Sequence, residues 1–164
     1  MGRDRGGTLI ELYLPLKWLH IVSSTVLFGT GLGTAFHFWY TMRTGNVAAI
    51  AAAARTTVLA DWLFTTPAVV LQPATGVAMA LIAGYPLTST WIAASIALYL
   101  VAGACWVPVV FIQLRMRDIA AASERDGRAL DPAFHRLARA WLALGWPAFI
   151  ALVIVFWLMI AKPG

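Results

Sequence analysis

The sequence predicts an all-α protein, a bundle of four transmembrane helices, and two observations lead to this prediction. Of the 164 residues, 61% are hydrophobic and only 12% are charged, whereas a soluble domain carries about 25% charged residues. The apolar residues also gather in four runs, each long enough for the roughly 20 residues that a spanning helix needs. We therefore expect one integral membrane domain over residues 1–164. The composition excludes a soluble enzyme, a disordered protein and a nucleic-acid-binding protein.

The four expected spans run over residues 16–42, 62–84, 91–114 and 141–160. Pro15 suits the first turn of the first helix, and residues 47–60, which are rich in alanine, are expected to form a short helix that leads into the second span. The connection over residues 115–140 is the most polar segment. Within it, Asp131-Pro132 is typical of an N-cap followed by proline at the first helical position, which predicts a helical lead-in to the fourth span.

The basic residues predict the orientation of the helices. No Asp, Glu, Lys or Arg occurs from Leu63 to Leu114, and the connections after the first and third spans carry eight arginines, namely Arg43, Arg55, Arg115, Arg117, Arg125, Arg128, Arg136 and Arg139. The opposite side carries four basic residues, Arg3, Arg5, Lys17 and Lys162. The positive-inside rule places the eight in the cytoplasm. We therefore expect the 115–140 connection to be cytoplasmic and both termini to be periplasmic.

Three histidines are the first candidates for chemistry, because polar groups inside a bilayer are costly. His20 and His37 are separated by 17 residues on the first helix, or about 25 Å along its axis, so they belong to different sites. The expected depths of His37 and His135 match, which allows a bis-histidine haem b between the first and fourth helices. Gly29 and Gly33 share a face with His37 and would admit the edge of a porphyrin. The alternative is close helix packing by the glycines, with a surface histidine at each position.

Polar residues inside the spans form a second set of candidates. His20 lies at the same expected depth as Met79, so a His/Met haem or a copper ion is one hypothesis, and a hydrogen-bonded interior histidine is the alternative. Pro67 and Pro73 free backbone carbonyl groups of the second helix, which favours a polar interior there. The residues expected in that interior are Gln72, Thr75, Ser95 and Tyr99.

One carboxyl group, that of Asp61, lies at the inner end of the second span. We expect it to form an ion pair with Arg55, Arg43 or an arginine of the long connection, as an interfacial anchor. A proton relay is the alternative interpretation. No other carboxylate lies inside a span, which disfavours an ion-coupled pump.

The run Lys17-Trp18-Leu19-His20-Ile21-Val22, followed by Phe28-Gly29-Thr30-Gly31, resembles the first helix of a bacterial family of predicted integral membrane proteins of unknown function. That family is similar in turn to HemJ-type protoporphyrinogen oxidases and CopD-type copper-resistance membrane proteins. The resemblance implies a multi-pass protein of the bacterial inner membrane, with His20 matching a histidine associated with haem or porphyrin. The oxidases also have a functional lysine early in the third helix, where this chain has Trp91-Ile92-Ala93-Ala94-Ser95.

Taken together, these features favour a small membrane protein that binds haem b or a porphyrin through His20, His37 or His135. Its expected role is electron transfer or porphyrin redox chemistry, although the missing lysine argues against a HemJ-like enzyme. Two alternatives stay open, both without haem. One is a non-catalytic subunit or scaffold of a larger membrane complex, and the other is a permease component for a metal or organic solute, suggested by the Gln72–Gly76 break. The expected partners are the lipid bilayer and a homo-oligomer or larger complex, with no nucleic acid.

Overall fold

The computed structural model describes residues 4–163, with side chains from residue 11 onward, and these residues form helices and turns with no strand. Arg3 lies outside the described residues, as does the side chain of Arg5. The helices are α1 (Asp4–Met42), α2 (Val47–Ala60), the π-helical turn η1 (Asp61–Thr65), α3 (Thr66–Ile82), α4 (Thr90–Arg125) and α5 (Pro132–Ala161). Because α2, η1 and α3 follow one another without a break, they form one rod of 36 residues.

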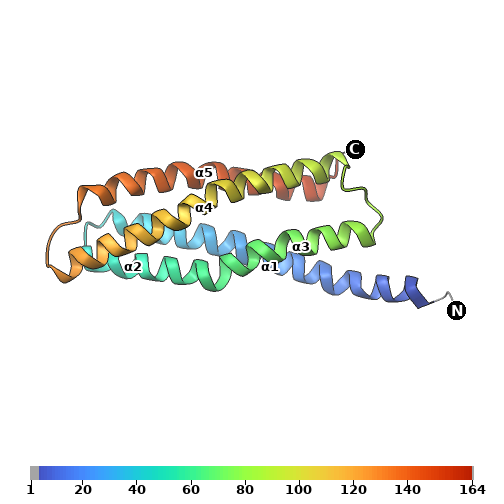
Figure 1. Cartoon of the computed structure of the whole chain (residues 1–164), viewed down its shortest axis with the longest axis horizontal. Coiled ribbons are helices and arrows are strands. Elements are labelled where there is room, and N and C mark those ends of the chain that lie inside the picture. The colour runs from blue at the N-terminus through green and yellow to red at the C-terminus, as the bar shows by residue number, and fades with distance from the viewer. Residues whose placement is uncertain (1–3, 164) are drawn as a thin grey trace.

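The described chain thus contains four helical rods that are long and apolar enough to cross a bilayer, which confirms the predicted fold class. One end of the bundle carries the turn after α1 and the connection from α4 to α5, and we call it the arginine-rich end (Figure 1). The opposite end, the terminal end, carries the α3–α4 turn and the start of α1 and end of α5. Helix α4 packs along α5 and also against α2, while α1 packs against α2 and α3.

The helices extend further than the predicted spans. Helix α1 begins at Asp4, so Pro15 lies inside it and the prediction that Pro15 occupies its first turn is wrong. Helix α4 does not stop near Leu114, because Met116, Ala120 and Ser123 keep a buried face at helical spacing as far as Arg125. Helix α5 begins at Pro132, and the side chain of Asp131 accepts a hydrogen bond from the backbone N–H of Ala133 at 2.7 Å. The predicted N-cap and lead-in helix are therefore confirmed, and the irregular connection is reduced to residues 126–131.

The length of the rods shows where they leave the hydrocarbon region. Helix α4 has 36 residues, or about 54 Å at 1.5 Å per residue, whereas a bilayer core is about 30 Å thick. The charge-free stretch of residues 63–114 includes the α3–α4 turn at the terminal end and the first part of α4. The part of α4 that exceeds the bilayer thickness is therefore the charged part after Leu114, at the arginine-rich end. There the large apolar side chains meet in what we call the packed core, formed by Phe38, Ile50, Met116, Phe134, Trp141 and their neighbours.

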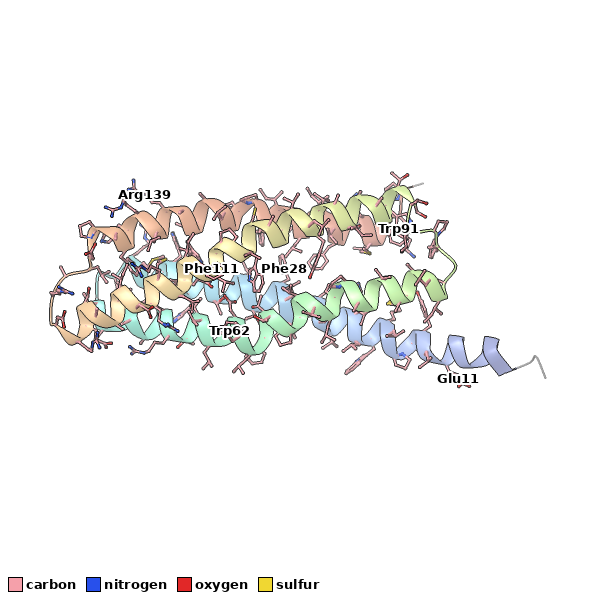
Figure 2. All side chains as sticks on the ribbon, in the orientation of Figure 1. Glu11, Phe28, Trp62, Trp91, Phe111 and Arg139 are labelled. Carbon is pink, nitrogen blue, oxygen red and sulfur yellow. The ribbon has the colours of Figure 1, made fainter. Side chains whose placement is uncertain are left out.

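Apolar side chains cover the outside of the bundle over the rest of its length. Figure 2 shows Arg139 at the arginine-rich end and Glu11 and Trp91 at the terminal end, with Trp62 and Phe111 between these ends. The side chain of Phe111 is 66% exposed and that of Trp62 is 56% exposed. Large exposed apolar residues of this kind are unfavourable in water and favourable against lipid.

Candidate functional site

A cluster of polar side chains joins α1 to α3 inside the spanning part of the bundle. The Nδ1 atom of His20 lies 2.9 Å from Oγ1 of Thr75, and its Nε2 atom lies 3.1 Å from Nε2 of Gln72. Ser23 donates a hydrogen bond to Oε1 of Gln72 at 2.6 Å. We call these four residues, together with Gly76, the His20 site.

Helical spacing explains how five residues from two helices converge there. His20 and Ser23 are three residues apart on α1, so they share a face. Gln72, Thr75 and Gly76 follow the spacing of three and four residues on α3, so they form the facing surface. Thr75 is buried, and His20 and Gln72 are half-buried. The polar groups therefore satisfy one another between the helices instead of facing lipid.

The hydrogen-bond partners assign the tautomer of His20. The Thr75 hydroxyl group donates its proton to the carbonyl oxygen of Leu71 at 2.7 Å, so it accepts from Nδ1–H of His20. The amide nitrogen of Gln72 is a donor, because the amide oxygen accepts from Ser23, so Nε2 of His20 accepts. With the Gln72 amide in this orientation, His20 is a neutral imidazole with its lone pair on Nε2.

Gly76 provides the space in which the His20 ring lies. A Cβ atom at position 76 would be 3.1 Å from Cε1 of His20 and 3.7 Å from its Nδ1. Any side chain there would push the ring away from Thr75. The sequence pattern places Gly76 in a helix break and gives no direct sign of a contact with His20. The signal for that contact is its position one residue after Thr75, on the same face of α3.

A second hydrogen bond ties α3 to α4 next to the His20 site. Pro73 has no N–H group, so the carbonyl group of Val69 loses its helical donor. Tyr99 of α4 donates its hydroxyl proton to this carbonyl oxygen at 2.7 Å. The sequence predicts that Pro73 frees a backbone carbonyl group of the second span, and this carbonyl group is hydrogen-bonded by a side chain of the neighbouring helix α4. Ser95, one turn before Tyr99, is buried and donates to the carbonyl oxygen of Trp91 on its own helix at 2.6 Å.

The other predicted haem residues lie elsewhere. His37 and His135 are both exposed, and Gly29 and Gly33 also face outward. A Cβ atom added to either glycine would meet no described atom within 4 Å. The glycine face therefore points away from the other helices of this chain. Met79, one turn after Thr75, is half-buried, and within the described residues no group of three or more His, Cys, Asp or Glu could hold a metal ion.

The prediction that Asp61 forms an ion pair with an arginine is wrong. Asp61 is buried in η1, and its carboxylate accepts a hydrogen bond from the Thr65 hydroxyl group at 2.8 Å. Arg55 instead pairs with Glu124 of α4 at 2.9 Å. The continuity of α2 into η1 explains this result, because six residues at about 100° each place Arg55 roughly 120° away from Asp61 around the helix axis.

Fold and site together define an integral membrane protein of four spanning helices, with hydrogen-bonded polar residues between them. Residues 14–163 match the family model described as predicted integral membrane protein (DUF2269). The chain therefore belongs to this family, which agrees with the family resemblance of the first helix. No curated protein and no solved structure matches the chain.

Proposed function

We propose that the protein binds one haem b through Nε2 of His20 and transfers electrons in the membrane. The observation that supports this proposal is the state of His20. Of the three histidines, His20 is the one held between two helices, with Nδ1–H directed at Thr75 and the lone pair on Nε2. A haem-bound iron takes a neutral imidazole nitrogen with a free lone pair.

The donor set of the His20 site fits such a ligand. A histidine that ligates a metal usually donates its other ring N–H to a nearby acceptor, which fixes the ring orientation, and Thr75 is that acceptor here. Gln72 would have to turn its amide away from Nε2. Ser23, which now bonds this amide, has a second acceptor in the carbonyl oxygen of His20 at 3.0 Å. Because His37 and His135 are exposed outside the site, the proposal is a single histidine ligand.

We favour electron transfer over porphyrinogen oxidation as the role of this haem. The bound haem would supply one-electron redox chemistry. Thr75 and Gly76 would orient the imidazole ring of His20, and the apolar surface of α1 and α3 would exclude water. The third span begins with Trp91 and has no lysine before Leu114, so it lacks the functional lysine position of the HemJ-type oxidases.

An absorbance spectrum of the purified protein tests the proposal. After expression with a haem precursor, we expect a Soret band in the wild type and its loss in His20→Ala. The matched variants His37→Ala and His135→Ala should keep the band, and Gln72→Ala should keep or strengthen it because Nε2 is then free. A wild type with no Soret band contradicts haem binding. A band that survives in His20→Ala and disappears in His37→Ala or His135→Ala contradicts the assigned ligand.

We also propose, as a second candidate, that the chain is a subunit of a larger membrane assembly. The supporting observation is the outward glycine face of Gly29 and Gly33, since small residues at this spacing let another helix approach closely. Cross-linking in native membranes followed by mass determination is the test. We expect a species larger than one chain that Gly33→Leu disrupts and Gly145→Leu, at an exposed helical glycine of α5, does not. A monomer that is unaffected by Gly33→Leu would contradict this candidate.

A further inference from the structure

The carboxyl group of Asp61 is a buried acidic group that the His20 site does not use. Asp61 is 7% exposed and lies at the start of η1, just before the charge-free stretch of residues 63–114. The next residue, Trp62, is exposed on the outer surface of the bundle, as is typical of the aromatic belt at a membrane boundary. Asp61 therefore lies near the level where the rods enter the hydrocarbon region from the arginine-rich end.

The side chains beside this carboxyl group are neutral. Thr65 donates its hydroxyl proton to Oδ1 at 2.8 Å, and the buried side chain of Gln113 on α4 lines the same small cavity as Asp61. An ionised carboxylate that is removed from water needs a paired charge, and neutral donors compensate only part of the lost hydration. The site is therefore suited to a carboxyl group that carries a proton.

No charged group of the described residues compensates Asp61 from the elements packed around it. On α2, Arg55 is paired with Glu124, and α3 contains no titratable residue. On α4 the first charged residue is Arg115, which is exposed, and on α1 the histidine at the same end, His37, is exposed as well. Among the described side chains, Asp61 takes part in none of the ion pairs.

A small cavity beside Asp61 and an unpaired hydroxyl group one turn away leave places for water near this carboxyl group. A cavity of about 10 Å³ lies against Asp61, lined by Trp62, Thr66 and Gln113 among others, and this volume accommodates one water molecule. One turn before Asp61, on the same helix face, Thr57 is 1% exposed and its hydroxyl group has no hydrogen-bond partner. Buried hydroxyl groups are normally bonded, often to an ordered water.

We propose that Asp61 is a proton-binding site served from the arginine-rich end. Hydronium delivers its proton through a water in the cavity, so that the carboxylate becomes a carboxylic acid and one water molecule is released. Thr65 orients the group, Gln113 lines the cavity beside it, and the π-helical turn brings it to the cavity; π turns are frequent at functional sites. This inference does not depend on haem binding at His20.

Infrared spectroscopy of the protein in liposomes tests this assignment. At near-neutral pH, where exposed carboxyl groups are ionised, we expect the C=O stretch of a protonated carboxyl group, with a frequency shift in D₂O, and we expect it to be absent in Asp61→Asn. The exposed control Asp118→Asn should keep the band. Thr65→Val, which removes one hydrogen bond and leaves the acid in place, should shift the frequency without abolishing the band.

Two outcomes would overturn the proposal. The first is a wild type whose carboxyl band is absent over the whole accessible pH range, or a band that persists in Asp61→Asn. The second is a band that disappears when sodium chloride, and not choline chloride, is added, because Asp61 would then bind a metal cation in place of a proton. If Asp61→Asn does not fold, the frequency shift in Thr65→Val still decides the assignment, since an unshifted band would belong to another carboxyl group.

Discussion

The two halves of the bundle are built differently. At the arginine-rich end, the buried residues include large apolar side chains such as Phe38, Ile50, Met116 and Phe134. Towards the terminal end, the buried residues are mostly small or polar, as Ser23, Thr75, Ala80 and Ser95 illustrate. The first half resembles the core of a soluble helical bundle. In the second half, hydrogen bonds join α1 to α3 and α4 to α3, and the ring of Phe28 packs against those of Phe149 and Phe156 on α5.

This difference follows from the solvent that surrounds each half. Near the end where the helices extend beyond the bilayer, apolar side chains avoid water by packing together, and each large one contributes about 1.5–3 kcal/mol. Inside the hydrocarbon region lipid is as apolar as leucine, so association depends on packing and on hydrogen bonds of about 0.6 kcal/mol on average. The comparison therefore predicts a steep gradient of mutational effects along the bundle.

The largest effect is expected in the packed core. Phe134 is buried and lies edge to face with Phe38, with ring centroids 6.4 Å apart. Phe134→Ala should lower the free energy of unfolding by about 3–5 kcal/mol, because it removes a large buried side chain and leaves a cavity. SDS titration monitored by circular dichroism measures this value. Phe111→Ala, on the exposed surface, should stay within about 0.5 kcal/mol of the wild type, and equal effects of the two variants would remove the distinction between the halves.

The next effect is expected at the His20 site. Gly76→Ala places a Cβ atom 3.1 Å from Cε1 of His20 and should displace the ring from its partners, with a loss of about 1–2 kcal/mol for two hydrogen bonds in the membrane. Alanine normally stabilises a helix relative to glycine by about 1 kcal/mol. The control Gly103→Ala on α4, where no described atom lies within 4 Å of the new Cβ, should therefore be neutral or stabilising. If both variants gain stability in thermal unfolding, the close contact between α1 and α3 is not as described.

A smaller effect is expected where α4 meets α3. Tyr99→Phe removes the donor to the carbonyl oxygen of Val69, which Pro73 leaves without a helical partner. We expect a loss of about 1 kcal/mol in the free energy of unfolding, within the range measured for hydrogen bonds in membranes. The double variant Tyr99→Phe with Pro73→Ala should recover most of this loss, because the alanine introduced by the second substitution can donate its own backbone N–H to Val69. A full effect of Tyr99→Phe in the Pro73→Ala background would argue that the hydroxyl group acts elsewhere.

The smallest effect is expected at the surface of the arginine-rich end. Arg55 and Glu124 form an ion pair at 2.9 Å, with 51% and 33% of their side chains exposed. Surface pairs of this kind contribute roughly 0–1 kcal/mol and are screened by salt, so Arg55→Gln should cost less than about 0.5 kcal/mol. Raising the salt concentration in the unfolding assay should bring wild type and variant together. A loss comparable to that of Phe134→Ala would show that charge, and not apolar packing, stabilises this end.

The sequence was sufficient to predict the four spans and much of the interior surface of α3. Hydropathy and length fix the spans, and polar residues in a charge-free stretch have to face other helices, which is why Gln72 and Thr75 could be named in advance. The partner of His20 could not be named. The contact between His20 and Thr75 links residues 55 positions apart and depends on the relative rotation of two helices, which one sequence does not specify.

The Asp61 ion pair, which was wrong, and the surroundings of the Gly29, Gly33 and His37 face, which the sequence left open, have a common explanation. Gly29, Gly33 and His37 do lie on one side of α1, as their spacing indicated, and that side faces away from the chain. Spacing identifies a face and says nothing of what the face contacts. For Asp61, proximity to Arg55 in sequence suggested an ion pair, but the unbroken helix through η1 carries the two side chains to different sides.

The π-helical turn η1 determines how one rod serves two different partners. Helix α2 uses its buried face to pack against α4 and α1, and α3 presents Gln72 and Thr75 to α1. An α-helix advances about 100° per residue, and a π turn contains one residue more than an α turn. Deleting a single residue from η1 would therefore rotate all of α3 by roughly a quarter of a turn relative to α2. The number of residues in η1 thus sets the angle between the buried face of α2 and the buried face of α3. A change in that number would turn Gln72 and Thr75 away from α1 while α2 stays in the packed core, although no residue of the His20 site or of the packed core is changed.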